Sequence, residues 1–427
     1  MKFRMALFFL VLTFHAYIGI LSATLLPGSS NIARYLFAIS DMVIVGLALT
    51  VFWRNRRYYG SIALWLFLLA ALLTFIYNSH RMGITATLNG LREPAFFISS
   101  LIIIYDFFQS RVREMFVAHF TRFLLIFALL QIPVTVYQVI SFGATDYVGG
   151  TFGWGGSGIL TQLLFLIAFY FIVRKGSLPD GTAFDIKKVF LYSILLIPCA
   201  LNETKISFIF LPLFFSLIAL TSGKVYRAIP VIILSVLLGL FWEYFYSTNV
   251  QETRTVFDLQ FIEKYMYSGS TNSEDMPRLA RIPIMFHLMR GDVGAILLGF
   301  GYGLFGGANV LGMTQLGKSL SFLGGSKVLL FTVWIQGGLL AVLVIMFAMF
   351  GFMRQTQWSY YTLRRFKWFF FFSLLLMWVY NDAILFRTFA IMAAYFMVFI
   401  FVGGDAEDIQ AAAGEQDESD EELPDDS

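Results

Sequence analysis

The sequence predicts an all-α polytopic membrane protein with about 12 transmembrane helices, one long extracytoplasmic loop and both termini in the cytoplasm. Of its 427 residues, 58% are hydrophobic and only 13% are charged, against about 25% charged residues in a typical soluble domain. Apolar runs of roughly 17 to 25 residues recur along the chain, each long enough to cross about 30 Å of hydrocarbon. The alternating ten-residue segments of an outer-membrane barrel do not occur. A soluble fold and a barrel are therefore excluded.

The predicted spans follow the apolar runs in order. They cover roughly residues 5–26, 33–53, 59–77, 95–109, 123–141, 157–173, 188–201, 206–222, 229–248, 326–350, 368–380 and 384–402. Three of these runs (95–109, 188–201 and 368–380) are short, so we expect tilted helices, broken helices or helices extended by their flanks. The first run has no small-residue cleavage site, which indicates a spanning helix rather than a removed signal peptide.

Lys and Arg between the spans predict the orientation, because cytoplasmic loops carry an excess of both. With the N-terminus in the cytoplasm, every cytoplasmic turn carries basic residues and the short outer loops are nearly free of them. The basic residues are Arg54, Arg56, Arg57, Arg111, Arg113, Arg174, Lys175, Lys187, Lys188, Lys224, Arg227, Arg354, Arg364, Arg365 and Lys367. The transmembrane domain then covers residues 1–404, with an extracytoplasmic loop at about 249–325.

The net charge of +3 is divided unevenly along the chain. From Asp405 to the end there are 11 acidic residues and no Lys or Arg. Residues 405–427 are therefore predicted to form an acidic, disordered cytoplasmic tail. The single cysteine, Cys199, excludes an internal disulfide.

Charged side chains at the predicted outer ends of the spans are the first candidates for a site. An ionised group inside the membrane costs at least about 2.5–3.5 kcal/mol, so each one requires a reason. Asp41 lies within the second span, where it serves either a helix–helix hydrogen bond or a function, whereas Asp106 lies near a span end and is interpreted as structural. Other polar residues lie at the outer level: Arg81, Arg92 and Glu93 before the fourth span, and Asn381, Asp382 and Arg387 before the last.

A polar break at Glu203 and Lys205 interrupts an apolar run from 189 to 220. The break falls at the predicted outer boundary of two spans, so both charges face the outer aqueous side or a cavity that opens to it. A simple turn between two helices explains the same pattern, and both interpretations stay open.

The long outer loop carries its own basic residues, among them Arg254, Arg278 and Arg281. If the segment around 278–281 is helical, Arg278 and Arg281 share a face and form a fork suited to phosphate or pyrophosphate. A solvated helix face accounts for the same spacing. His287 in this segment is either a base or a structural histidine.

Motifs of soluble enzymes do not occur in the chain: there is no P-loop, HExxH, GxSxG or Cys/His cluster suited to zinc. No metal, other cofactor or nucleic acid is expected as a partner. The Gly-rich stretch LGFGYGLFGG at 298–307 follows no parallel-strand pattern, so we expect its glycines to form a tight re-entrant turn at the membrane surface.

The order of several features resembles the O-antigen polymerase and ligase family. These features are GTFGWGGSG at 150–158, the break NETK at 202–205, an Arg-bearing helix that leads into LLGFGYG at 297–303, and Gln336, Gly337 and Gly338 in an apolar helix. The resemblance covers roughly residues 120–350. The family joins lipid-linked glycans on the outer face of the bacterial inner membrane. Ser326 and Lys327 stand where its ligases carry His-Asn, Gln336 stands where an acid is usual, and Lys205 would replace an arginine. The loss of the histidine favours a polymerase over a ligase.

The resemblance implies that undecaprenyl-pyrophosphate-linked repeat units are polymerised into a surface polysaccharide by metal-independent glycosyl transfer. Catalysis would then use Arg278, Arg281 and Lys205 against the charge of the leaving pyrophosphate, with Glu203 or His287 as the general base. Substrate-binding candidates are Arg92, Arg81, Arg254, Lys327 and Arg387. The expected partners are the donor and acceptor glycans, the lipid bilayer, and a chain-length regulator or other assembly protein.

Two other functional classes fit parts of the pattern. About twelve spans with cytoplasmic termini are typical of a transporter, such as a flippase for lipid-linked oligosaccharides. Transporters often contain two similar halves with matching broken helices, and no such halves are found here. A non-catalytic assembly subunit that docks through the acidic tail is the third interpretation.

Overall fold

The computed structural model describes residues 1–20, 30–54, 59–143, 148–153, 156–174, 186–202, 207–220, 233, 237, 280–305, 315–320, 323, 328–350 and 361–402. Every regular element within these ranges is a helix, and no strand occurs among them. The predicted all-α class is therefore confirmed.

The helices follow one another along most of the predicted spans. They are α1 (Lys2–Ile20), α2 (Ser30–Arg54), α3 (Tyr59–Asn78), α4 (Ile84–Phe108), α5 (Arg113–Phe142), η2 (Gly150–Phe152), α6 (Ser157–Arg174), α7 (Ile186–Ser193), η3 (Ile194–Leu196), α8 (Ile197–Leu201), α9 (Ser207–Leu220), α12 (Arg281–Met289), α13 (Val293–Leu298), α14 (Gln315–Ser319), α15 (Leu329–Phe350), α16 (Tyr361–Tyr380), η8 (Ala383–Leu385) and α17 (Arg387–Val402). The predicted span at 229–248 lies almost wholly outside the described residues.

The three short apolar runs have the two expected outcomes: two belong to helices extended by their flanks, and one belongs to a broken helix. Helix α4 begins at Ile84 and α16 at Tyr361, so the flanks extend both beyond their apolar runs. The run at 188–201 is instead divided into α7, η3 and α8. Because α4 starts early, Arg92 and Glu93 belong to a helix and not to a loop between two spans, which corrects their predicted setting.

Membrane association follows from the apolar helices. Four stretches are long and apolar enough to cross a bilayer: Tyr35–Arg54, Gly60–Asn78, Arg113–Phe142 and Leu329–Phe350. Shorter apolar helices cover Ser157–Ile172, Val189–Leu201, Phe366–Tyr380 and Arg387–Ile400. Helix α3 exposes large apolar side chains on one face, at Trp65, Leu69, Leu72 and Ile76, which suits contact with lipid. The full number of spans and their orientation stay predictions.

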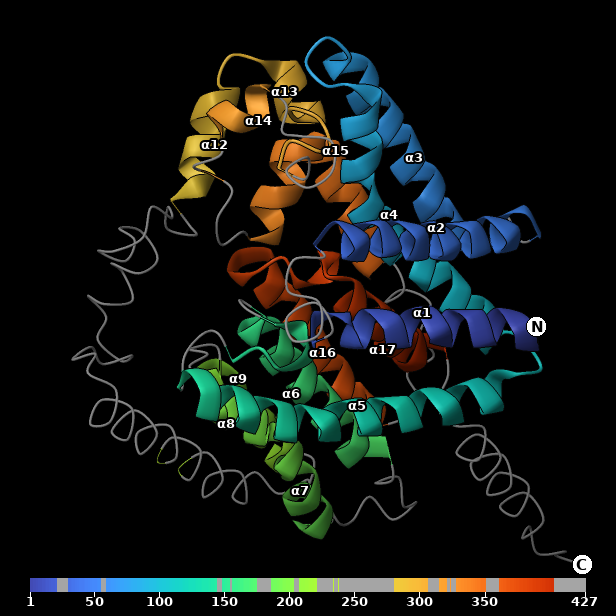
Figure 1. Ribbon diagram of the computed structural model, residues 1–427, viewed down its shortest axis with the longest axis vertical. Helices are drawn as coiled ribbons and strands as arrows, with labels where there is room; N and C mark the ends of the chain where they lie inside the picture. Colours follow the sequence, from blue (N-terminus) through green and yellow to red (C-terminus); the bar gives the residue numbers. More distant parts are fainter. Residues whose placement is uncertain are drawn as a thin grey trace, which may run out of the picture.

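Helix α4 connects two groups of helices. Figure 1 shows α1, α2 and α5 running roughly parallel across the molecule, while α12, α13 and α14 gather at one end near α3 and α15. Helix α4 packs against α2 and α17 and also against α3, which packs against α15. Helix α15 in turn packs against α13. Side chains on α4 can therefore reach both groups.

Aromatic side chains fill much of the space between these helices. The ring of Tyr395 on α17 stacks on Phe120 of α5, with a centroid distance of 3.9 Å. Its hydroxyl lies 3.0 Å from the hydroxyl of Tyr170 on α6. Phe8 of α1 packs edge-on against Phe107 of α4. These contacts tie α17 to α5 and α6, and α1 to α4.

Candidate functional site

The carboxylate of Asp41 is fully buried between two arginines from distant parts of the chain. Arg387 donates from Nη2 to Oδ2 at 3.2 Å and from Nε to Oδ1 at 3.4 Å. Nε of Arg92 lies 2.7 Å from Oδ2 of the same carboxylate. The Asp41 side chain is 0% exposed. A charge buried to this extent is tolerated only with partners of opposite sign, and here two are supplied.

A second carboxylate, Glu93, completes the cluster. Nη1 of Arg387 donates to Oε1 of Glu93 at 3.3 Å. The Glu93 side chain is 45% exposed, against 17% for Arg387 and 24% for Arg92. Two carboxylates and two guanidiniums cancel in formal charge. These four residues, Asp41, Arg92, Glu93 and Arg387, are called the Asp41 cluster below.

Three helices bring the cluster together. Asp41 lies on α2, Arg92 and Glu93 lie on α4, and Arg387 is the first residue of α17. Adjacent residues of a helix point about 100° apart, so Arg92 reaches toward α2 while Glu93 reaches toward α17. Both neighbours pack directly on α4. The cluster is thus a product of tertiary packing and not of a local motif.

Arg92 retains hydrogen-bonding capacity that the cluster does not use. Its Nε is close enough to Asp41 for an ion pair, but this buried N–H makes no hydrogen bond in the described structure. A guanidinium has five N–H donors. Among the described residues Asp41 is its only ion-pair partner. Arg92 therefore contributes charge at this place while most of its donors stay available.

His15 of α1 lines the other side of Asp41. Its Nε2 lies 2.9 Å from the hydroxyl of Ser40 and 3.7 Å from Oδ1 of Asp41. The Ser40 hydroxyl donates to the carbonyl oxygen of Phe37 at 2.9 Å. Since a hydroxyl has one hydrogen, we infer that Nε2 of His15 carries the proton that Ser40 accepts. The ring stacks on Phe37, which also lies 6.0 Å from the guanidinium carbon of Arg387.

A break in α15 holds the Gly-rich turn at 299–303. Gly338 has a φ of 69° inside this helix, so the regular hydrogen bonds of the preceding turn cannot all form. The carbonyl oxygen of Ile335 accepts instead from the backbone N–H of Phe300 at 2.8 Å, and that of Gln336 from Gly301 at 3.0 Å. A tight turn is therefore present at this stretch, and the broken helix supplies its hydrogen-bond acceptors. Its predicted re-entrant position at the membrane surface stays a prediction.

The turn then approaches α4 backbone to backbone. The side-chain Oε1 of Gln336 accepts from the backbone N–H of Gly303 at 3.1 Å. Gly303 has a φ of 91°, and a Cβ added at Gly90 of α4 would overlap its backbone nitrogen. Only glycine at position 90 allows this approach. It brings Tyr302 against the part of α4 that carries the Asp41 cluster.

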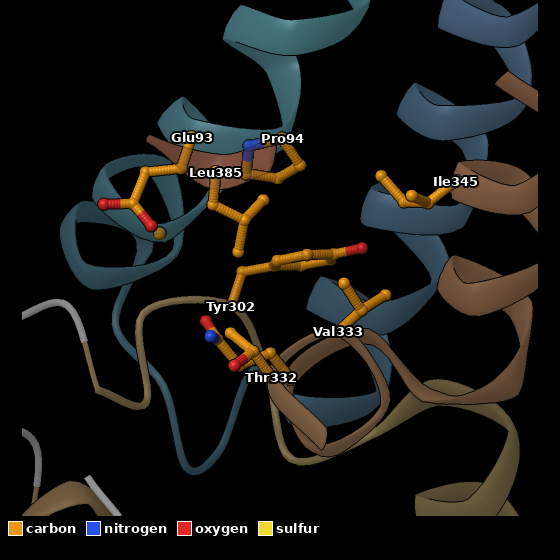
Figure 2. Close-up of a pocket in the computed structure, with 9 residues that line it drawn as sticks. Glu93, Pro94, Tyr302, Thr332, Val333, Ile345 and Leu385 are labelled. Carbon is orange, nitrogen blue, oxygen red and sulfur yellow. The ribbon is translucent and has the colours of Figure 1, made fainter. Parts of the chain in front are cut away.

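A small cleft lies where the turn, α4 and α15 meet. It is lined by Gly90, Glu93, Pro94, Tyr302, Thr332, Val333, Gln336, Ile345 and Leu385. Figure 2 shows the ring of Tyr302 between Pro94 and Leu385 on one side and Val333 on the other. Burial raises the pKa of Tyr302, and its hydroxyl has no hydrogen-bond partner in the described structure. Glu93 is thus shared between the cluster and the cleft.

The predicted site residues fall into separate groups. Arg92 and Arg387 meet in the Asp41 cluster. Arg81 is exposed in the turn before α4, near Asp292. Arg281 is fully buried at the start of α12, whereas His287 is exposed on another face of the same helix. The other five lie outside the described residues: Glu203, Lys205, Arg254, Arg278 and Lys327.

Two residues at the site were not among the predicted ones: His15 and Tyr302. His15 could have been noticed as an ionisable residue in the first apolar run, at a depth comparable with that of Asp41. Tyr302 could have been noticed only as the non-glycine centre of GYG. Among the described residues, no group of three or more His, Cys, Asp or Glu side chains is arranged to hold a metal ion.

The Gly-Thr-Phe segment at Gly150–Phe152 forms a buried turn against α5. Gln131 accepts from the backbone N–H of Thr151 at 2.9 Å, and Gln138 accepts from that of Gly150 at 2.8 Å. The two glutamines are seven residues apart and thus lie on one face of the helix. Phe152 packs on Phe386, which directly precedes Arg387. This segment therefore supports the start of α17.

Comparison of the chain with protein-family models, with curated proteins and with solved structures finds no match.

Proposed function

We propose that the protein is a membrane-embedded glycosyltransferase that polymerises undecaprenyl-pyrophosphate-linked repeat units on the outer face of the bacterial inner membrane. The observation that carries the proposal is the Asp41 cluster. Two arginines from α4 and α17 meet in a buried setting beside a cleft formed by the Gly-rich turn. Arginine suits this chemistry because its planar fork binds phosphate oxygens in pairs.

The reaction places defined demands on such a site. An acceptor hydroxyl oxygen forms a bond to the anomeric carbon of the donor glycan, and the bond from that carbon to pyrophosphate breaks. The bonding electrons leave with pyrophosphate, whose negative charge grows in the transition state. Arg92 and Arg387 would stabilise this charge from fixed positions, which is the most effective form of electrostatic catalysis. The acceptor proton passes to a base, for which Glu203 and His287 remain the candidates.

The long extracytoplasmic loop and three positions outside it (Arg81, Lys205 and Lys327) supply a second set of cations in this proposal. Arg278 and Arg281 keep their proposed role at the leaving group, together with Lys205, while Arg81, Arg254 and Lys327 bind the glycan or its phosphates. Arg281 is fully buried, so in this proposal the substrate must open a path to its guanidinium. His287 is exposed and therefore accessible to an acceptor.

Complementation of a deletion strain tests the proposal. Wild type, Arg387→Lys and Arg92→Lys are expressed to equal levels in the membrane, and surface glycan is separated on a gel. Lysine keeps the charge but removes the planar fork, so we expect long polymers to collapse toward single repeat units. Arg54 pairs with a different buried aspartate, Asp106, at 2.6 Å, so Arg54→Lys is the matched control and should leave the polymer intact. Unchanged polymer in both site variants would contradict the proposal.

Export of a lipid-linked oligosaccharide is the second candidate function. It is favoured by one observation: the imidazole of His15 and the carboxylate of Asp41 lie 3.7 Å apart inside the helix bundle, and acidic and histidine side chains within spans often mark proton pathways of transporters. The same strains separate the two functions. A transporter variant accumulates finished repeat units on the inner face, whereas a polymerase variant displays single units on the outer face.

A further inference from the structure

We infer that Glu93 occupies, in the unliganded protein, the position on Arg387 that a phosphate or pyrophosphate group takes when substrate binds, with Arg92 close by on the same carboxylate of Asp41. Glu93 is thus a built-in competitor at an anion site. The inference deepens the proposed function, on which it rests, by assigning the part of the substrate that this cluster would recognise.

The two carboxylates of the cluster are held very differently. Asp41 is fully buried and receives two hydrogen bonds from Arg387. Glu93 receives one, at 3.3 Å, and its side chain is nearly half exposed. Water can solvate the Glu93 end of this ion pair, whereas the Arg387 end is mostly buried. Glu93 can therefore be exchanged for another anion that takes its place on Arg387, whereas Asp41 cannot.

The charge balance makes a replacement necessary. With Glu93 withdrawn, two guanidiniums remain on the single carboxylate of Asp41, which leaves one positive charge in a mostly buried place. A buried charge without a partner is strongly unfavourable. Another anion must therefore take the place of Glu93. A phosphate group suits this place better than a second carboxylate because it offers more acceptor oxygens to the two guanidiniums.

The geometry also provides donors for the incoming anion. Departure of Glu93 releases Nη1 of Arg387. The Nε of Arg92 is ion-paired with Asp41, and the remaining donors of this guanidinium have no ion-pair partner among the described residues. The cleft runs along Glu93 and the Gly-rich turn, so a group that displaces the carboxylate enters beside that turn. Two guanidiniums can thus donate hydrogen bonds to one phosphate group.

A second cluster in the chain shows what the same residue types do without such a competitor. Asp106 pairs with Arg4 and Arg54, and among the described residues neither arginine pairs with another carboxylate. The Arg54 side chain is 54% exposed, so water already solvates the excess charge. No displaceable group is needed there, and Arg54 serves as a matched control for Arg387.

Binding of inorganic pyrophosphate to the purified full-length protein tests the inference. Calorimetry is performed in nanodiscs of zwitterionic lipid. Glu93→Gln keeps the shape of the side chain and removes its charge, so we expect it to bind pyrophosphate about tenfold more tightly than wild type or better. Arg387→Lys should lose most of the binding, and Arg54→Lys should match wild type.

Two results would overturn the inference: equal or weaker binding by Glu93→Gln, or a loss in Arg54→Lys as large as that in Arg387→Lys. Glu93→Asp, which keeps the charge, should bind like wild type. It keeps the test decisive if the glutamine variant does not fold, because tighter binding by the aspartate variant would also count against a competing carboxylate.

A second set of nanodiscs, made with anionic lipid, distinguishes the sources of the phosphate. If anionic lipid competes with pyrophosphate in Glu93→Gln, the site takes phosphate from a headgroup; if it does not, the site takes the pyrophosphate of a substrate. Both outcomes support an anion site that binds phosphate.

The glycan gel separates this inference from the proposed function. Tighter binding by Glu93→Gln in a protein that makes no polymer keeps the anion site and overturns the polymerase. If polymer formation depends on Arg387 but Glu93→Gln does not change pyrophosphate binding, the proposed function stands and only the role of Glu93 as a competitor is overturned.

Discussion

Two buried aspartates in this protein are each flanked by two arginines, yet they lie in different surroundings. Asp106 on α4 pairs with Arg54 at 2.6 Å and with Arg4 at 3.4 Å. Asp41 on α2 pairs with arginines at 2.7 and 3.2 Å. In residue types and distances the Asp106 cluster (Arg4, Arg54, Asp106) and the core of the Asp41 cluster are nearly the same.

What differs is where the excess positive charge goes. In the Asp106 cluster the excess reaches water through Arg54, whose side chain is more than half exposed. In the Asp41 cluster both arginines are mostly buried, and a second carboxylate, Glu93, balances the charge. The comparison teaches that ion pairing alone does not mark a site. A displaceable partner and an adjoining cleft mark this one.

The largest effect is expected when the central acids are neutralised. Asp41→Asn leaves two mostly buried guanidiniums with only Glu93, which should destabilise the fold by about 3–5 kcal/mol. Asp106→Asn should cost about 1 kcal/mol or less, because Arg54 is exposed. Thermal unfolding of both variants in the same detergent measures the difference. Equal losses would break the comparison.

The close approach of α4 to the Gly-rich turn gives the next largest effect. Gly90→Ala places a Cβ on the backbone nitrogen of Gly303, so the turn must move and stability should fall by about 1–3 kcal/mol. Gly46→Ala on α2 meets nothing within 4 Å and should be neutral or stabilising by up to about 1 kcal/mol. Thermal midpoints of the two variants check this. A harmless Gly90→Ala would show that the cleft does not depend on this contact.

Substitutions of Gln336 test whether its hydrogen bond to Gly303 stabilises the Gly-rich turn beside the Asp41 cluster. Gln336→Leu removes the acceptor of the Gly303 N–H and leaves that group unpaired, at a cost of about 1–3 kcal/mol. Gln336→Glu keeps an acceptor oxygen in the same place and should cost less. Unfolding measurements rank the two. If the leucine variant is the more stable, the side chain of Gln336 does not hold the turn.

The smallest effect concerns Asp292, an acid at the molecular surface outside both clusters. Hydrogen bonds from the Tyr77 hydroxyl and from the backbone N–H of Ala295 lower the pKa of Asp292. A lowered pKa in the folded state stabilises the protein above the ordinary value of about 4 and loses this effect as the pH falls through the folded-state pKa. The thermal midpoint of wild type should therefore exceed that of Asp292→Asn slightly at pH 7. This advantage should shrink as the pH falls below the ordinary value of about 4, and an advantage that grows on acidification would contradict the assignment.

Composition and apolar runs predicted the fold class and most helices, because lipid-facing and buried helices are apolar along their whole length. The early start of α4 was missed since residues 84–94 are less apolar and contain Pro94. The hydrogen bond between Arg387 and Asp41 joins residues 346 positions apart, and no local pattern encodes such a contact. The sequence did mark Asp41, Arg92 and Arg387 separately as charges where charge is costly. Only the packing of α2, α4 and α17 against one another brings these three residues into contact.

The tight turn at 299–303 was predictable from its glycines, but its acceptors were not. They arise from the break at Gly338, which the sequence showed only as a Gly-Gly pair in an apolar helix. Likewise, the predicted fork at Arg278 and Arg281 stays a prediction, because Arg278 lies outside the described residues.

Reconstitution tests the central claim most directly: that the Asp41 cluster, and not the Asp106 cluster, carries the function. Purified wild type, Arg387→Lys and Arg54→Lys are placed in liposomes with lipid-linked repeat units, and the length of the glycan is measured over time. We predict elongation by wild type and Arg54→Lys and none above background by Arg387→Lys. Elongation by Arg387→Lys at the wild-type rate, or its equal loss in Arg54→Lys, would contradict the account.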